Sequence, residues 1–94
     1  MIFRVLVNGQ NFLIELDGLN QKYGFYTTRF VEAENEEIAE ANAIEVLRND
    51  DSLKVRVKND AYDPPMMFVE EIEKIIIGGP IHNTGFAWYK EVEE

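Results

Sequence analysis

Residues 24–51, GFYTTRFVEAENEEIAEANAIEVLRNDD, predict a strand, a sharp turn and a helix, and the rest of the chain is interpreted outward from them. Aromatic, β-branched and threonine residues follow closely in residues 25–33, which is typical of a pleated and largely buried strand. Apolar side chains alternate onto both faces of this segment. We therefore expect an interior strand covered on both sides, with Phe25 on one face and Tyr26 and Phe30 on the other.

Asn35 marks the change from strand to helix, because an asparagine oxygen accepts hydrogen bonds from the free amides of a first helical turn. Glu36 and Glu37 then place negative charge at the positive end of the helix dipole. We predict a helix over residues 36–49. Its sheet-facing residues are expected to be Ala39, Ala43, Val46 and Leu47. A second apolar flank, covered by another segment or open to a partner, consists of Ile38, Ala41 and Ile44.

Two further strands, residues 2–7 and 11–17, are expected to form a β-hairpin that turns at residues 8–11 and places Val7 opposite Phe12. Residues 53–58 alternate between apolar and basic side chains, so we predict a strand there, parallel to residues 25–33 after a crossover through the helix. Residues 86–92 are the last predicted strand.

The type of element formed by residues 66–77 is ambiguous. Their apolar spacing fits a helix, whereas their composition and their position before the last strand fit a β-strand. We predict a strand over residues 66–76, with a second helix as the alternative. The expected fold is a single α+β domain over residues 1–94, with a mostly antiparallel twisted sheet of four to five strands and the main helix packed on one face.

Length and composition exclude several classes of protein. Ninety-four residues suit one small domain, and the absence of cysteine excludes disulfides and thiolate chemistry. The start of the chain lacks the features of a signal peptide, and no apolar run is long enough to span a membrane. We therefore expect a soluble, cytoplasmic protein.

The chain is acidic, with a formal net charge of −9 that comes almost entirely from its second part. Residues 1–31 carry two acidic and three basic side chains, and residues 32–94 carry sixteen and six. This balance opposes direct binding to nucleic acid or to anionic membranes. It either keeps a small domain soluble or imitates a phosphate backbone toward a basic partner protein.

Few residues suggest chemistry. The one histidine, His82, lies in a glycine-bounded loop with Asn83 and Thr84, and these three are the weak candidates for ligand binding. Lys54, Arg56 and Lys58 form a basic stripe that suits a phosphate or the acidic patch of a partner, although cross-strand pairing with Glu32, Glu70 or Glu71 is the simpler interpretation. No catalytic, phosphate-binding or metal-binding motif is present, so we expect no enzyme, no cofactor and no metal.

Aromatic residues are numerous for a small sheet, and one helix covers only one face. An uncovered face would expose aromatics, which is the usual footprint of a partner. Together with the second helix flank, the residues expected to form such contacts are Tyr26, Phe30, Ile38, Ala41, Ile44, Trp88 and Tyr89.

These observations favour a non-catalytic interaction or regulatory domain that self-associates, most simply as a homodimer. The alternative is an acidic inhibitor that mimics nucleic acid and occupies a basic partner. A carboxylate-based hydrolase or a small-molecule-binding domain is the weaker alternative.

Overall fold

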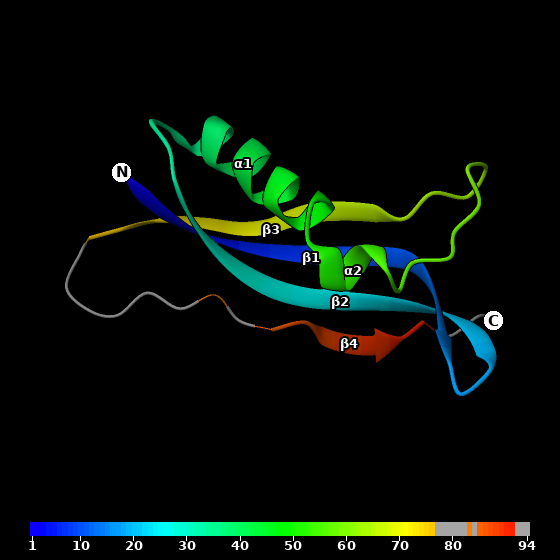
Figure 1. The fold of residues 1–94 in the computed structure, drawn as a ribbon. Coiled ribbons are helices and arrows are strands. Elements are labelled where there is room, and N and C mark those ends of the chain that lie inside the picture. Colours follow the sequence, from blue (N-terminus) through cyan, green and yellow to red (C-terminus); the bar gives the residue numbers. More distant parts are fainter. Residues whose placement is uncertain (77–82, 84, 92–94) are drawn as a thin grey trace.

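The computed structural model describes residues 1–76, 83 and 85–91. Within them, four antiparallel strands lie side by side in the order β3–β1–β2–β4 (Figure 1). In chain order, the elements are β1 (Ile2–Leu16), β2 (Leu19–Glu32), α1 (Glu36–Arg48), α2 (Asp51–Lys54), β3 (Met66–Ile75) and β4 (Ala87–Lys90). The predicted α+β class is confirmed: the chain forms one compact domain with one main helix packed on a four-stranded sheet.

The predicted hairpin between residues 2–7 and 11–17 is wrong, because both segments belong to the single strand β1, which pairs with β2. The chain reverses instead at Asp17 and Gly18, whose φ angles are 53° and 80°. Positive φ at both central residues is the geometry of the tight turn that matches strand twist, and Asp-Gly is well suited to it.

Residues 8–11 form an irregularity within β1 rather than a turn. The β1–β2 register shifts between Gly9 and Phe12, and Asn11 has a φ of 62°. An extra residue in a left-handed conformation bends and twists a strand without reversing it. β1 therefore continues past Asn11 to Leu16.

The strand expected over residues 53–58 is also wrong, and with it the parallel crossover. Residues 51–54 form the short helix α2, and the side chain of Asp50 caps it by accepting a hydrogen bond from the Leu53 amide. Only Val57 forms a bridge, to Ile14. This local capping outweighs the alternating pattern. Lys54, Arg56 and Lys58 therefore do not lie together on one strand.

Residues 66–75 form strand β3, antiparallel to β1, so the predicted strand is confirmed. The helical spacing of its apolar residues has a structural reason. The β1–β3 register shifts where Leu6 pairs with Glu71 and Val7 pairs with Val69, leaving Glu70 as an extra residue. This bulge breaks the twofold alternation. β4 occupies the middle of the segment predicted as the last strand, part of which lies outside the described residues.

Helix α1 begins as predicted, with the Asn35 side chain accepting a hydrogen bond from the Ile38 amide at 2.9 Å. Ala39, Ala43 and Leu47 are fully buried against β1, β2 and β3. Val46, predicted to face the sheet, is 49% exposed. The helix is therefore rotated so that Ala39, Ala43 and Leu47, which are spaced four residues apart, face the sheet and Val46 does not.

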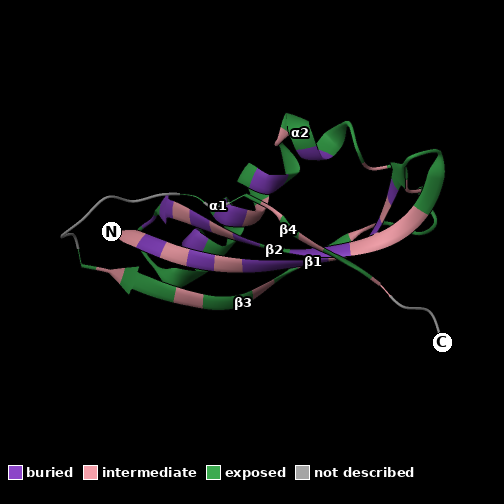
Figure 2. Cartoon of the chain, turned by 90° about the horizontal axis from the view of Figure 1, so that it is seen from below, coloured by how far each residue is buried: buried purple, intermediate pink, exposed green. Residues whose placement is uncertain are grey.

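The core lies between the helices and one face of the sheet, and buried residues concentrate on β1, β2 and the inner side of α1 (Figure 2). Under α1 it consists of Phe3, Val5, Val7, Val31, Ala33, Ala39, Ala43 and Leu47. Under α2 it consists of Phe12, Ile14, Phe25 and Leu53, with Trp88 and Phe86 packed against them.

Arg29 is a buried cation between these two parts of the core. It donates hydrogen bonds to the Thr27 hydroxyl at 2.7 Å and to the Thr28 carbonyl at 3.0 Å. Its guanidinium lies 3.9 Å from Asp50 and over the Phe86 ring. Burial lowers the pKa of Arg29 and the Asp50 carboxylate opposes that shift. Arg29 therefore links β2 to the start of α2.

Among the described residues, no helix combines the length and the apolar composition needed to cross a membrane.

Candidate interaction surface

The sheet has a second face, turned away from α1 and α2, which no described segment covers. We call it the open face. The register of the four strands places the following residues on it: Ile2, Arg4, Leu6, Asn8 and Gln10 of β1, Tyr26, Thr28, Phe30 and Glu32 of β2, Met66, Phe68, Glu71, Glu73 and Ile75 of β3, and Ala87 and Tyr89 of β4. The expectation that β2 is covered on both sides therefore fails within the single chain.

Three aromatic side chains on the open face are accessible to solvent. Tyr26 is 42% exposed, Phe68 44% and Tyr89 37%. We call these three residues, together with the exposed Met66, the aromatic patch. Leu6 and Phe30 are partly exposed beside it. Partly buried aromatic rings on an uncovered sheet face form an apolar surface of the kind that partners occupy.

A row without formal charge crosses all four strands within this patch. Phe68 pairs with Asn8, Asn8 with Tyr26, and Tyr26 with Ala87. Charged residues make up 29% of the chain. The core of a protein interface is typically poor in charged residues and rich in Tyr, Phe and Met.

Tyr89 is held in place from below and from the side. Its ring lies directly over Gly24, where an added Cβ would come within 2.2 Å of the ring. Its hydroxyl accepts a hydrogen bond of 2.9 Å from Nδ2 of Asn8, which is itself buried and also donates to the Phe25 carbonyl. The ring centroids of Tyr26 and Tyr89 are 5.7 Å apart. The aromatic patch is therefore built on fixed side chains, which lose little freedom on binding.

The other end of the open face carries one cation, Arg4, beside two carboxylates. Arg4 forms ion pairs with Glu73 at 3.1 Å and with Glu71 at 3.7 Å. Such exposed pairs contribute little to stability. Arg4 therefore offsets only part of the negative charge at this end of the open face.

The residues predicted for interaction divide between the two layers. Tyr26, Phe30 and Tyr89 lie together on the open face. Trp88, the neighbour of Tyr89, faces the other way and packs in the core with its ring centroid 5.2 Å from that of Phe25. Of the two adjacent aromatic residues of β4, Tyr89 is thus on the open face and Trp88 is not.

The second flank of the helix does not join this surface. Ile38 and Ala41 are exposed on α1, whereas Ile44 packs against the core. These residues belong to the helical layer, on the side of the sheet opposite the open face. They do not extend the aromatic patch.

The predicted ligand loop is only partly described. His82 and Thr84 lie outside the described residues. Asn83 accepts a hydrogen bond of 2.8 Å from the Phe30 amide through its side-chain oxygen. That contact gives Asn83 a structural role beside β2.

Sequence reasoning missed Phe68 and Met66. The signal was available in residues 66–76, because a strand there places Met66 and Phe68 on one face and Met67 and Val69 on the other. The competing helical pattern hid this alternation.

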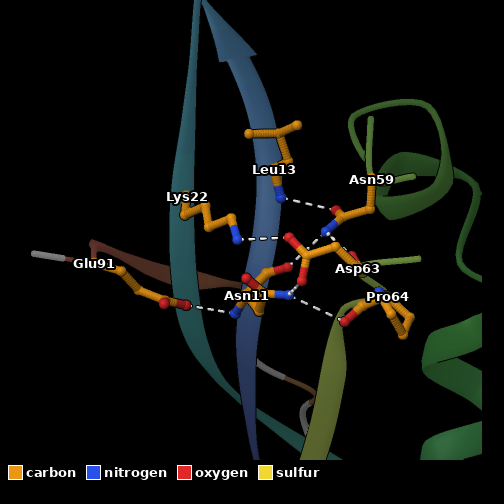
Figure 3. A network of polar contacts seen from close by, with 7 residues as sticks. All are labelled: Asn11, Leu13, Lys22, Asn59, Asp63, Pro64 and Glu91. Atoms are coloured by element: carbon orange, nitrogen blue, oxygen red, sulfur yellow. Dashed lines mark hydrogen bonds and ion pairs between the residues drawn. The ribbon is translucent and has the colours of Figure 1, made fainter. Parts of the chain in front are cut away.

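A polar network fixes the loop before β3 to the bulge of β1 (Figure 3). The Asp63 carboxylate accepts hydrogen bonds from Lys22 at 2.6 Å and from the Asn11 side chain at 2.8 Å. Asn59 accepts from the Leu13 amide and donates to the Asn11 carbonyl, both at 2.8 Å, and Glu91 accepts from the Asn11 amide. The Lys22 hydrogen bond, with that from Asn11, lowers the pKa of Asp63. Each polar group here is used in holding the chain together.

No cluster of three or more acidic or histidine side chains in the described part of the chain is arranged to bind a metal ion. Comparisons of the chain with family models, with curated proteins and with solved structures gave no match. The residues themselves are therefore the basis for a proposed function.

Proposed function

We propose that this chain is a non-catalytic interaction module that self-associates through the open face of its sheet. The observation that carries the proposal is the uncharged row across the four strands of that face, in which Phe68, Tyr26 and Ala87 are exposed and Asn8 is buried between them. An apolar surface of this kind is stabilised when another surface removes it from water, at about 25 cal/mol for each Å² buried.

A second copy of the chain is the partner that this surface fits. Twofold interfaces bring the same patch of each subunit together, so the patch must be complementary to itself. The aromatic patch carries no formal charge and does not repel its copy. The exposed glutamates of α1, by contrast, lie on the far side of the sheet from it. Two sheets packed through their open faces would lie about 10 Å apart, as in other sheet-on-sheet packings.

A matched pair of substitutions tests this proposal. Tyr26→Glu places a charge in the centre of the patch, and Tyr62→Glu makes the same change in a loop, at a side chain that is 99% exposed. Light scattering coupled to size-exclusion chromatography at micromolar concentration should give a dimer for the unchanged chain and for Tyr62→Glu, and a monomer for Tyr26→Glu. A monomer in all three cases would overturn the proposal. So would a dimer that persists in Tyr26→Glu with its fold intact by circular dichroism.

A further inference from the structure

A cavity of about 340 Å³ lies in the helical layer, on the opposite side of the sheet from the open face. It is a pocket that opens to solvent, bounded by β1, by the end of α1, by α2, by the turn after α2 and by the start of β3, with the exposed Arg48 and Lys54 at its rim. Its lining residues are Phe12, Leu47, Arg48, Leu53, Lys54, Val57, Pro65 and Met67. This volume is at the lower end of the range for small-molecule sites in proteins.

The lining combines an apolar interior with two cations. Apart from Arg48 and Lys54, every residue around the cavity is apolar. Arg48 and Lys54 form no ion pair within the described residues, a property they share with Arg56, Lys58, Lys74 and Lys90, but of these six cations only Arg48 and Lys54 line this pocket. In a chain of net charge −9, two cations left without carboxylate partners at one apolar cavity favour an anionic ligand.

The position of the cations limits the charge of that ligand. Arg48 is in the last turn of α1, where the helix dipole is negative. Phosphate sites typically use the opposite, positive end of a helix and several backbone amides. A ligand with a single negative charge and an apolar body therefore fits this cavity better than a phosphate.

We propose that the cavity binds an amphipathic monocarboxylate. Its apolar tail lies among Phe12, Val57 and Met67, and its carboxylate is held by Arg48 and Lys54. This site is separate from the aromatic patch. Ligand binding at this site therefore does not depend on self-association.

Octanoate is a suitable probe, with octanol as its uncharged counterpart. Titration into the full chain is followed by methyl chemical shifts in NMR spectra. Octanoate should shift the methyl signals of Leu53, Val57 and Met67 in a saturable way, and octanol should bind these methyl groups about tenfold more weakly because it lacks the carboxylate. Absence of saturable shifts, or shifts confined to the open face, would overturn the proposal.

A pair of double variants tests the contribution of the two cations. Arg48→Gln with Lys54→Gln should weaken octanoate binding about tenfold and leave octanol binding unchanged. Arg56→Gln with Lys58→Gln removes the same charge from residues that do not line this cavity, and should leave octanoate binding unchanged. Equal weakening by both double variants would show a general charge effect and overturn the assignment.

Val57→Trp fills the cavity and should abolish the saturable shifts of both probes, with the remaining spectrum confirming the fold. If Val57→Trp still binds octanoate with unchanged affinity, the ligand occupies another place and the proposal fails.

Discussion

Gly9 lies where the packing of β1 leaves no room for a side chain. A Cβ added there would lie 2.1 Å from Cε2 of Phe25. The Phe25 ring is fully buried, with its centroid 5.0 Å from that of Phe12 and 5.2 Å from that of Trp88. It therefore has no free space into which to move.

Gly9→Ala should lower the free energy of unfolding by about 1–3 kcal/mol, the usual effect of overpacking a core. Urea denaturation measures the change. Gly85→Ala is the control, because a Cβ at Gly85 meets nothing within 4 Å, and it should stay within about 0.5 kcal/mol of the parent chain. Equal stability of the two variants would contradict the packing described around Phe25.

Asp63 gives the loop before β3 a dependence on pH. Its pKa is lowered by hydrogen bonds from Lys22 and Asn11, so its pKa in the folded chain is below its unfolded value of about 3.9. A depressed carboxyl pKa contributes stability above the unfolded pKa, and this contribution is lost as pH falls through the folded pKa.

Asp63→Asn should therefore destabilise the chain at neutral pH, and the difference from the parent should shrink as pH falls below about 4. Urea denaturation at a series of pH values measures this. Asp60→Asn changes a neighbouring carboxylate with no hydrogen bond or ion pair to the described residues, and should show no such trend. A constant difference for Asp63→Asn across the acidic range would contradict the proposed linkage.

At the scale of elements, the rotation of α1 determines which side chains hold it on the sheet. Leu47→Ala removes a fully buried side chain and should lower the free energy of unfolding by about 2–5 kcal/mol. Val46→Ala, at the adjacent exposed position, should change it by about 0.5 kcal/mol or less. Thermal or urea unfolding compares the two. A larger loss of unfolding free energy for Val46→Ala than for Leu47→Ala would indicate that Val46 faces the sheet, as expected from the sequence.

The sequence predicted those elements whose local signals agree with each other. α1 has a capping asparagine, acidic residues in its first turn and a regular apolar stripe, and it begins at the predicted residue. The strand character of β2 likewise follows from its composition. In these segments, capping, charge and periodicity all support one structure.

The errors occurred where two local signals compete. Asn8-Gly9 and Asp17-Gly18 are both suited to a tight turn, and the structure reverses only at Asp17 and Gly18. In residues 53–58, apolar alternation competes with the N-cap supplied by Asp50, which forms α2. Tertiary packing decides such cases, and the sequence pattern does not contain that information.

The candidate surface was predictable in part for the same reason. Tyr26 and Phe30 follow from alternation within one strand. Whether Trp88 or Tyr89 accompanies them depends on the β2–β4 register, in which Tyr89 pairs with Gly24. Phe68 joins them only because β3 lies next to β1. Strand order and register are non-local, so the sequence alone did not identify the complete surface.

At the scale of the whole molecule, the net charge of −9 acts against self-association. If two copies meet through the uncharged aromatic patch, the negative charges elsewhere on the two chains repel each other. Salt weakens this repulsion, because the Debye length is about 10 Å at 0.1 M ionic strength. The dimer should therefore become tighter as sodium chloride is raised. Sedimentation equilibrium measures this, and weaker association at higher salt would indicate that opposite charges hold the copies together.

The most direct measurement of the central claim is an isotope-filtered nuclear Overhauser experiment on an equal mixture of ¹³C-labelled and unlabelled chains. It detects only contacts between different copies. Self-association through the open face predicts signals between the two molecules at the rings of Tyr26, Phe68 and Tyr89 and at the Met66 methyl group. Intermolecular signals arising from α1, or no intermolecular signal at concentrations where the chain is folded, would contradict self-association through the open face.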